Sequence, residues 1–168
     1  YNIPSQTIDM LTSQIDKEKQ LSQLKKNRIK VPKSFIANSL EEAENNIDSL
    51  KFPLIAKPTI GSGSKGVNKI NSYEELKKIN DSLSNSKKGR IILQEFVKGD
   101  EFSIETFCHD EKIKFLATSK REINKSMSAT DIFTYKIDKV LFNEISGEIE
   151  KIYEIFEYPN GPGHFELI

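Results

Sequence analysis

A glycine-rich hexapeptide, Gly61 to Gly66, constrains the fold of this chain more than any other segment. It reads Gly-Ser-Gly-Ser-Lys-Gly and follows an apolar run, Pro53 to Pro58, in which Lys57 is the only charge. Three glycines in six positions allow a tight turn and let backbone N–H groups approach a ligand closely. A nearby lysine adds a positive charge suited to phosphate. The two features together predict an anion-binding loop.

The flanks of this loop exclude two common phosphate-binding folds. Residues 67–70 look like a second strand, and the next helix starts only at the capping box of residues 72–75. A dinucleotide-binding unit needs the glycines to open a helix directly. A P-loop needs Lys-Ser or Lys-Thr at its end, whereas Lys65 is followed by Gly66. The loop is therefore predicted to join two strands.

Composition narrows the class of protein. The 168 residues are 36% hydrophobic, which suffices for one ordinary domain or two small lobes. Lysine plus arginine and aspartate plus glutamate number 25 each, so the chain lacks the basic surface that a nucleic-acid partner requires. No apolar stretch approaches the roughly 20 residues that span a bilayer, and no signal-peptide pattern opens the chain. We expect neither nucleic acid nor membrane as a partner.

The single cysteine and the chain ends give further expectations. One cysteine excludes an internal disulfide and suits a reducing, cytoplasmic setting. The sequence begins at Tyr1 without methionine and stops inside a strand-like run, so we expect the natural polypeptide to continue and this last strand to pair with a following one. The oligomeric state stays open, with a homo-oligomer as one option.

Periodicity, caps and turns predict an α+β order of elements. Cys108 and His109 are adjacent on one of the expected strands, so they face opposite ways and do not form a nucleophile pair. Residues 119–142 are expected to include a mobile active-site loop. We expect helices from a cap at Asp16 to about 26, from a cap at Ser39 to before 53, over 72–83 and over about 144–156. We expect strands over 31–37, 53–58, 67–70, 90–97, 102–107, 112–118 and, after a turn at 160–163, over 164–168.

This order of parts, together with the run Gln94 to Glu105, resembles the ATP-grasp superfamily. The similarity extends from about residue 15 to 168 and looks closest to the carboxylate-amine ligases, the group that includes biotin carboxylase, carbamoyl phosphate synthetase and D-alanine ligase. The resemblance implies two α+β lobes that hold ATP between antiparallel sheets. It divides the chain into an N-terminal linker with helices (1–50), a small lobe with a glycine-rich flap (51–98) and a large-lobe portion cut at the metal-binding strand (99–168), so that the fold is C-terminally incomplete.

The same resemblance implies an enzyme that activates a carboxylate as an acyl phosphate, which an amine or similar nucleophile then attacks. Its partners would be small-molecule carboxylates and amines. The alternative, from a different class, is a regulatory module that binds ATP without turnover. Phosphate contacts are implied for Lys17, Lys57 and the flap residues Ser62, Gly63, Ser64 and Gly66. A solvated lysine is an equal reading of Lys17, and a flexible Gly-Ser hairpin without a ligand is the alternative for the loop.

Adenine and ribose contacts are implied for the connector between the lobes. Gln94 takes a position where many relatives have a glutamate that accepts from the adenine amino group, and an amide oxygen can accept as well. Glu95, Phe96 and Val97 would add apolar packing and backbone hydrogen bonds. Glu101 matches an acidic residue that binds ribose hydroxyls, with a surface carboxylate as the alternative.

A metal contact is implied for Glu166, in the last strand. Alternation places His164 and Glu166 on one face of that strand, and carboxylate oxygens suit Mg²⁺, with Mn²⁺ as a substitute. The alternative is the solvated face of an edge strand. The family's other ligands, a glutamate and an asparagine, would lie beyond Ile168. Arg121, next to Lys120, is a candidate for a basic side chain directed at phosphate or substrate.

Overall fold

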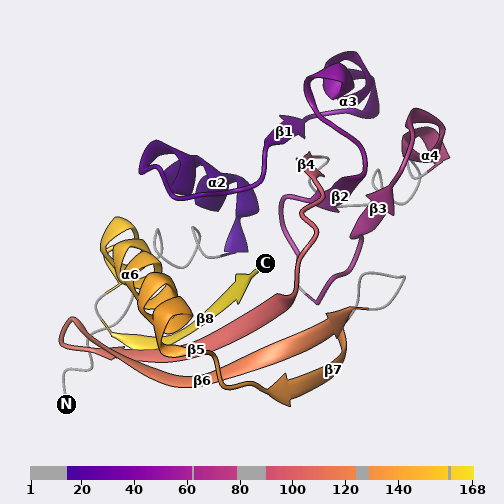
Figure 1. Ribbon diagram of the computed structural model, residues 1–168. Coiled ribbons are helices and arrows are strands. Elements are labelled where there is room, and N and C mark those ends of the chain that lie inside the picture. The colour runs from indigo at the N-terminus through magenta and orange to yellow at the C-terminus, as the bar shows by residue number, and fades with distance from the viewer. Residues whose placement is uncertain (1–14, 62, 79–89, 124–128, 159) are drawn as a thin grey trace.

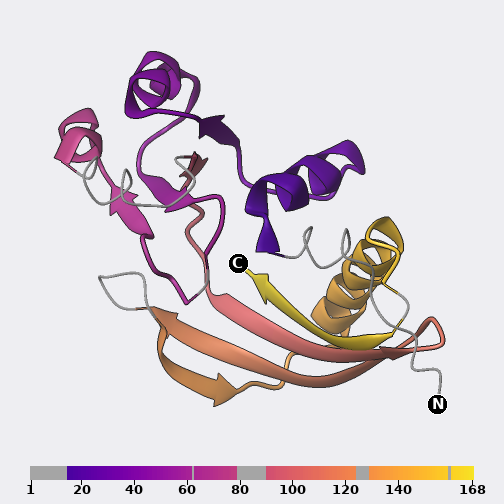
Figure 2. The same ribbon diagram turned by 180° about the vertical axis from the view of Figure 1, so that it is seen from behind.

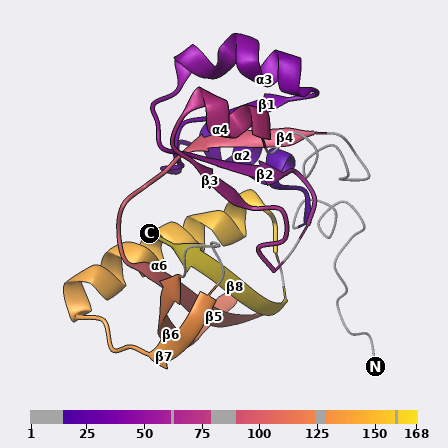
Figure 3. The same cartoon turned by 90° about the vertical axis from the view of Figure 1, so that its right-hand side faces the viewer.

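Two four-stranded antiparallel sheets lie one above the other in the computed structural model (Figures 1 and 3), which describes residues 15–61, 63–78, 90–123, 129–158 and 160–168. Helices cover one face of each sheet, and helix α2 (Lys17–Lys26) lies between the two layers (Figure 2). We call the unit around the first sheet the small lobe and the unit around the second the large lobe. The expected α+β fold with antiparallel sheets is confirmed.

The small lobe contains strands in the order β1-β4-β2-β3, all antiparallel to their neighbours. Because β1 is an edge strand of this sheet, the small lobe includes residues that the sequence assigned to the N-terminal segment. The elements are β1 (Ser34–Ala37), α3 (Leu40–Asn46), the 3₁₀ turn η1 (Ile47–Ser49), β2 (Leu54–Pro58), β3 (Asn68–Ile70), α4 (Tyr73–Lys78) and β4 (Ile91–Glu95).

Strand alternation gives this sheet two different faces. One face packs against α3 and α4 and supplies the core, which includes Leu54, Ala56, Ile91 and Leu93 from the strands and Ala43 and Leu76 from the helices. The period of two therefore directs Lys57 and Gln94 to the opposite face. That face is the one turned away from the helices, and it carries the polar side chains of the candidate site.

Capping residues set the helix starts where the sequence places them. Asp16 Oδ1 accepts from the backbone N–H of residue 18 at 3.0 Å and caps α2. Ser39 Oγ accepts from the N–H of Glu42 at 3.1 Å, and Ser72 does the same for α4. The Glu42 carboxylate reaches back one residue beyond the serine, to the N–H of Asn38 at 2.8 Å. The three predicted starts are confirmed, whereas the predicted end of α4 lies outside the described residues.

The large lobe contains strands in the order β7-β6-β5-β8, with α6 across one face. Ile149 and Tyr153 of α6 pack against Ile104, Cys108 and Phe165 of the sheet. Cys108 is buried and His109, the next residue of the strand, is exposed, so their side chains face opposite ways as expected. The elements are β5 (Glu101–His109), β6 (Lys112–Ile123), β7 (Ala129–Thr134), α6 (Lys139–Ile155) and β8 (Gly161–Leu167).

Three boundaries in this lobe differ from the prediction. Much of the segment 119–142 is regular, because β6 runs on to Ile123 and pairs with β7. Helix α6 begins at Lys139 and not near residue 144, since Asp138 caps it by accepting from the backbone N–H groups of Val140 and Leu141. The turn expected at 160–163 is the start of β8, which pairs with β5 from Gly161 onward. None of the helices described has the length and hydropathy needed to span a bilayer.

Two connecting segments meet the small-lobe sheet side by side. Residues 27–33 lead from α2 into β1, and residues 96–100 lead from β4 into β5 and so join the two lobes. The N–H of Glu95 donates to the carbonyl of Lys33 at 2.9 Å, where both segments reach the sheet. The start of α2 is also tied to the small lobe, since the N–H of Lys17 donates to the carbonyl of Thr59 at 3.0 Å.

Candidate functional site

The glycine-rich loop joins β2 to β3 and makes a tight turn, as the sequence predicts. Gly63, Ser64 and Gly66 have φ values of 63°, 56° and 75°, in the left-handed region, and the N–H of Val67 closes the turn on the Ser64 carbonyl at 3.2 Å. A Cβ at Gly66 would lie 3.3 Å from Pro58 Cδ, so both conformation and space favour glycine there. Ser62 lies outside the described residues.

Two lysines lie at the base of this loop. Lys57 projects from β2 and its Nζ donates to Gln94 Oε1 at 2.9 Å. Lys17, the first residue of α2, donates from Nζ to the carbonyl of Gly61 at 2.6 Å. Both acceptors are neutral. The loop is therefore held at its start by a lysine from outside the small-lobe sheet.

Burial changes the ionisation of both amines. It lowers the pKa of Lys57 below its ordinary value of 10.5; the ammonium of Lys17 lowers it further, and the carboxylate of Glu166 opposes the shift. Burial also lowers the pKa of Lys17, against the carboxylates of Asp16 and Glu166. Among the residues that the structure describes, neither lysine has a carboxylate oxygen within 4.0 Å. Their charges are available for a bound anion, and phosphate is the anion that a glycine turn with backbone N–H groups suits.

The connector after β4 is anchored mainly through Glu95 and Phe96. The N–H of Glu95 is bonded to Lys33, and its Oε1 accepts from the N–H of Lys51 at 3.0 Å. The N–H of Phe96 donates to a carbonyl just before β2, and Lys69 Nζ lies 3.6 Å from the Phe96 ring centroid. The Glu95 N–H is thus engaged within the protein, whereas the Val97 side chain is exposed. The predicted nucleobase contacts of these residues stay predictions.

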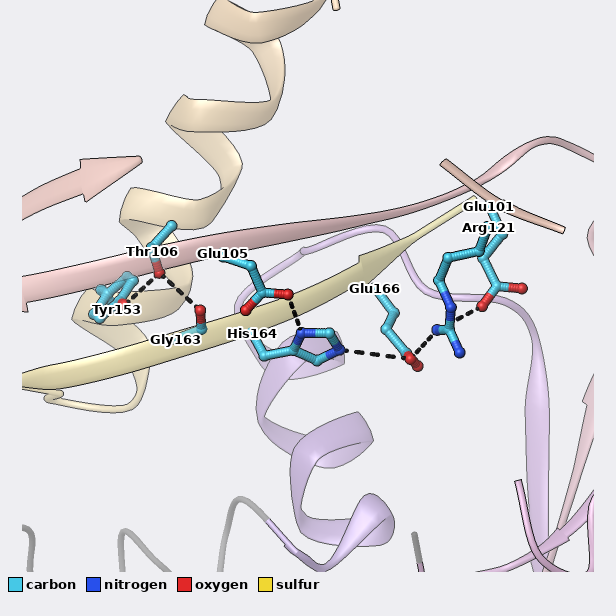
Figure 4. A network of polar contacts seen from close by, with 8 residues as sticks. All are labelled: Glu101, Glu105, Thr106, Arg121, Tyr153, Gly163, His164 and Glu166. Atoms are coloured by element: carbon cyan, nitrogen blue, oxygen red, sulfur yellow. Dashed lines mark hydrogen bonds and ion pairs between the residues drawn. The ribbon is translucent and has the colours of Figure 1, made fainter. Parts of the chain in front are cut away.

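A chain of ionisable side chains runs along β8 and its neighbours in the large lobe (Figure 4). Arg121 Nη1 lies 2.9 Å from Glu101 Oε1 and is also bonded to Glu166 Oε1. His164 Nε2 lies 3.6 Å from the same Glu166 oxygen, and its Nδ1 lies 2.6 Å from Glu105 Oε1. Arg121 therefore brings together the predicted ribose and metal carboxylates.

Burial and repulsion act on Glu101 in this chain. Burial raises the pKa of Glu101 above its ordinary value of 4.5, the Arg121 guanidinium lowers it, and the Glu166 carboxylate raises it again. The Arg121 side chain is only 14% exposed, and these two carboxylates compensate its largely buried charge. Lys120, its neighbour in sequence, points elsewhere and pairs with Asp100 at 2.9 Å.

The residues described do not make a metal site by themselves. No group of three or more histidine, cysteine, aspartate or glutamate side chains within the described ranges is arranged to hold an ion. The single predicted ligand, Glu166, already contacts Arg121 and His164. We therefore derive no chemical step through a metal here.

Sequence reasoning missed Glu105 and its bond to His164. Period-two alternation on β5 places residue 105 on the same face as Glu101, which is the signal that could have found it. Strand β8 is an edge of its sheet within the described chain, and a cavity of about 450 Å³ adjoins it. Gln20 and Leu24 of α2 line this cavity together with α6 and residues 162–167.

Comparison with known proteins decides the family. The model of the ATP-grasp domain matches residues 15–157. The chain belongs to the ATP-grasp family. The expected resemblance is confirmed.

Relatives with known activities are similar over most of the chain. An L-arginine-specific L-amino acid ligase of Bacillus subtilis is 25% identical over 154 residues, which cover 87% of this chain and 37% of that enzyme. The carbamoyl phosphate synthase large chain of Helicobacter pylori (strain J99) is 28% identical over 142 residues, covering 82% of this chain and 13% of the relative. The chain thus spans 37% of the length of the amino acid ligase and 13% of the length of the carbamoyl phosphate synthase large chain.

Solved structures agree in fold. An L-amino acid ligase from Bacillus licheniformis superposes with a TM-score of 0.82 at 20% identity, over 99% of this chain and 39% of that one. A biotin carboxylase from Campylobacter jejuni, in complex with a nucleotide, has a TM-score of 0.81 at 13% identity, over 95% of this chain and 38% of that one. At such identities the likeness establishes the ATP-grasp fold.

Proposed function

We propose that this chain is the ATP-binding part of an ATP-dependent ligase that activates a carboxylate as an acyl phosphate for an amine or similar nucleophile. The observation that carries the proposal is the convergence of Lys17 and Lys57 at the base of the glycine turn. Both amines are partly buried, and both bond only to neutral acceptors in the described structure. Two such charges beside the backbone N–H groups of a glycine turn favour a polyphosphate.

Different residues of the site would contact different parts of the nucleotide. Lys57 and Lys17 would neutralise phosphate oxygens, and the turn at 63–66 would close over them with backbone N–H groups. The connector at 94–97 would receive the base. Glu101, which directly follows residues 96–100, would accept from ribose hydroxyls once its ion pair with Arg121 is shared or released.

The chemistry asks little of side-chain acids and bases. A carboxylate oxygen of the substrate attacks the γ-phosphorus and ADP leaves, which gives an acyl phosphate; the nucleophile then attacks the acyl carbon and phosphate leaves. Such transfers depend on holding the groups in line and neutralising charge. Arg121 is the cation of the large lobe that could serve the transferred group. The Bacillus subtilis relative is an L-arginine-specific L-amino acid ligase, which supports an amino acid as the carboxylate substrate.

Mg²⁺ is the counter-ion that we expect to accompany ATP, with Mn²⁺ as a substitute. Glu166 is the carboxylate proposed to contact it, and the other ligands would have to come from outside the described residues. We also propose the cytoplasm as the setting, because its reducing conditions suit the one buried thiol, Cys108.

Binding and turnover can be separated by experiment. We expect MgATP to bind to the native protein, and Lys57→Ala to weaken binding at least tenfold because a desolvated charge contact is lost. Lys112→Ala, at an exposed position in the distant β5–β6 hairpin, is the matched control and should bind normally. Isothermal titration calorimetry measures both.

Turnover is then assayed with the full-length protein against a panel of carboxylates and amines, as ADP and phosphate release. Release that depends on one such pair supports the ligase. Tight MgATP binding with no release on any pair would favour an ATP-binding regulatory module. Absence of ATP binding in the native protein would overturn both.

A further inference from the structure

Gln94 lies at the centre of the small-lobe sheet, where its side chain is nearly enclosed. It pairs with Ser34 of β1 on one side and with Ile55 of β2 on the other. The residue is 8% exposed and shares its face with Lys57, one step along the diagonal between strands. The bond between Lys57 Nζ and Gln94 Oε1, at 2.9 Å, joins the two.

The chemistry of lysine fixes which end of this amide faces it. An ammonium group has three donors and no acceptor, so the atom that it contacts must be the amide oxygen. Reversing the amide would set its NH₂ group against the ammonium and break the bond. Because no carboxylate lies within salt-bridge reach of Lys57 in the described structure, the amide oxygen is its principal side-chain acceptor there. The NH₂ group of Gln94 is therefore the end that remains for a ligand.

This orientation changes the role that the sequence suggested for Gln94. The 6-amino group of adenine lies between two acceptors, N1 on the Watson–Crick edge and N7 on the major-groove edge, and the major-groove edge offers one donor, the amino group, and one acceptor, N7. An NH₂ group cannot accept from the amino group, whereas it can donate to N7. We propose that Gln94 reads the nucleobase as a donor to purine N7, and not as an acceptor from the 6-amino group. This inference rests on the proposed function, since it requires ATP to lie against the connector.

A consequence for specificity follows. Adenine and guanine both carry N7, so Gln94 does not distinguish a 6-amino from a 6-oxo purine. The choice between adenine and guanine would then depend on the backbone of the connector. A glutamate at position 94 would behave differently, because it has acceptors only and would leave N7 without a donor.

The test combines a nucleotide that lacks N7 with variants of residue 94 that lack the NH₂ group. The probe is 7-deaza-ATP, in which a C–H replaces N7, and calorimetry compares its affinity with that of ATP. The native protein should lose about 2- to 12-fold in affinity, the range of one neutral hydrogen bond. Gln94→Glu should lose less than twofold. Gln94→Met, of similar length and without a donor, should behave like the glutamate variant and covers the case in which Gln94→Glu does not fold.

Gln23→Glu, at an exposed position on α2, is the matched control and should keep the native sensitivity. Equal losses in the native protein and both position-94 variants would overturn the inference, as would equal binding of the two nucleotides by the native protein. These outcomes leave ATP binding intact, so they differ from failure of the proposed function, in which the native protein binds neither nucleotide.

Discussion

Gly163 lies in strand β8 at a place where the structure leaves no room for a side chain. A Cβ built there would be 2.3 Å from Tyr153 Oη and 2.5 Å from Thr106 Oγ1. These two hydroxyls share a buried hydrogen bond of 2.7 Å, and Thr106 also donates to the Gly163 carbonyl at 3.3 Å (Figure 4). Gly163→Ala must therefore displace β8 from α6 or break the bond between the hydroxyls.

The cost follows from these contacts. Loss of the bond between the hydroxyls removes about 0.5–1.5 kcal/mol, and forcing a methyl group into a packed site adds about 1–3 kcal/mol. We expect Gly163→Ala to lower the free energy of unfolding by roughly 2–4 kcal/mol, a large part of the roughly 5–15 kcal/mol typical of a domain. Urea denaturation followed by circular dichroism measures the change.

A matched control separates this effect from the general effect of replacing glycine. Gly147 lies within α6, and a Cβ there would meet nothing within 4 Å. Gly147→Ala should raise stability by about 0.5–1 kcal/mol, because alanine loses less backbone entropy in a helix. Tyr153→Phe, which removes the nearest oxygen, should reduce the cost of Gly163→Ala in the double variant. If Gly163→Ala unfolds at the native urea concentration, the account of β8 packing is wrong.

Two further predictions concern charge. Because the pKa of Lys57 lies below 10.5, the free energy of unfolding without nucleotide should rise with pH from the lowered pKa up to 10.5. Urea denaturation at a series of pH values measures this rise, and Lys57→Met should abolish it. An identical rise in the variant would contradict the prediction. Arg121→Met should destabilise the protein by roughly 1–3 kcal/mol at pH 7, since Glu101 and Glu166 lose their shared cation. The Arg121→Met deficit should shrink as the pH falls toward 4.5. Without the guanidinium the pKa of Glu101 rises further, so the variant loses more stability than the native protein as the pH rises; a deficit that does not change with pH would count against the network.

Local signals predicted the parts of the fold that depend on neighbouring residues. The caps at Asp16, Ser39 and Ser72 and the strand-loop-strand around the glycines were readable because each needs only a few adjacent positions. The start of α6 was not, since its first turn exposes Val140 and Leu141 and so shows no apolar periodicity. Gly163 has the sequence of a turn but lies in a strand, because tertiary packing against Tyr153 decides its place.

The candidate site shows the same division. Residue type and order indicated the two lysines, Glu101 and Glu166 one by one. Their pairing through Arg121 depends on the register of β5, β6 and β8, which pattern alone does not determine. The contact between Lys57 and Gln94 likewise required β2 and β4 to be neighbours, although they are 37 residues apart in the sequence.

The bond between the Glu95 N–H and the Lys33 carbonyl extends the pairing of β1 with β4 by one residue. Residues 96–100 therefore leave the small-lobe sheet from a point held on both sides, by β1 and by β2. Pro58, at the base of the glycine-rich loop, lies four residues along β2 from Leu54, the partner of Glu95, and so about 13 Å away. A rotation of the small lobe by about 10° about the Glu95 end of the sheet would carry the base of the loop through about 2 Å. A small change in the angle between the lobes would thus be enough to make or break hydrogen bonds at the loop.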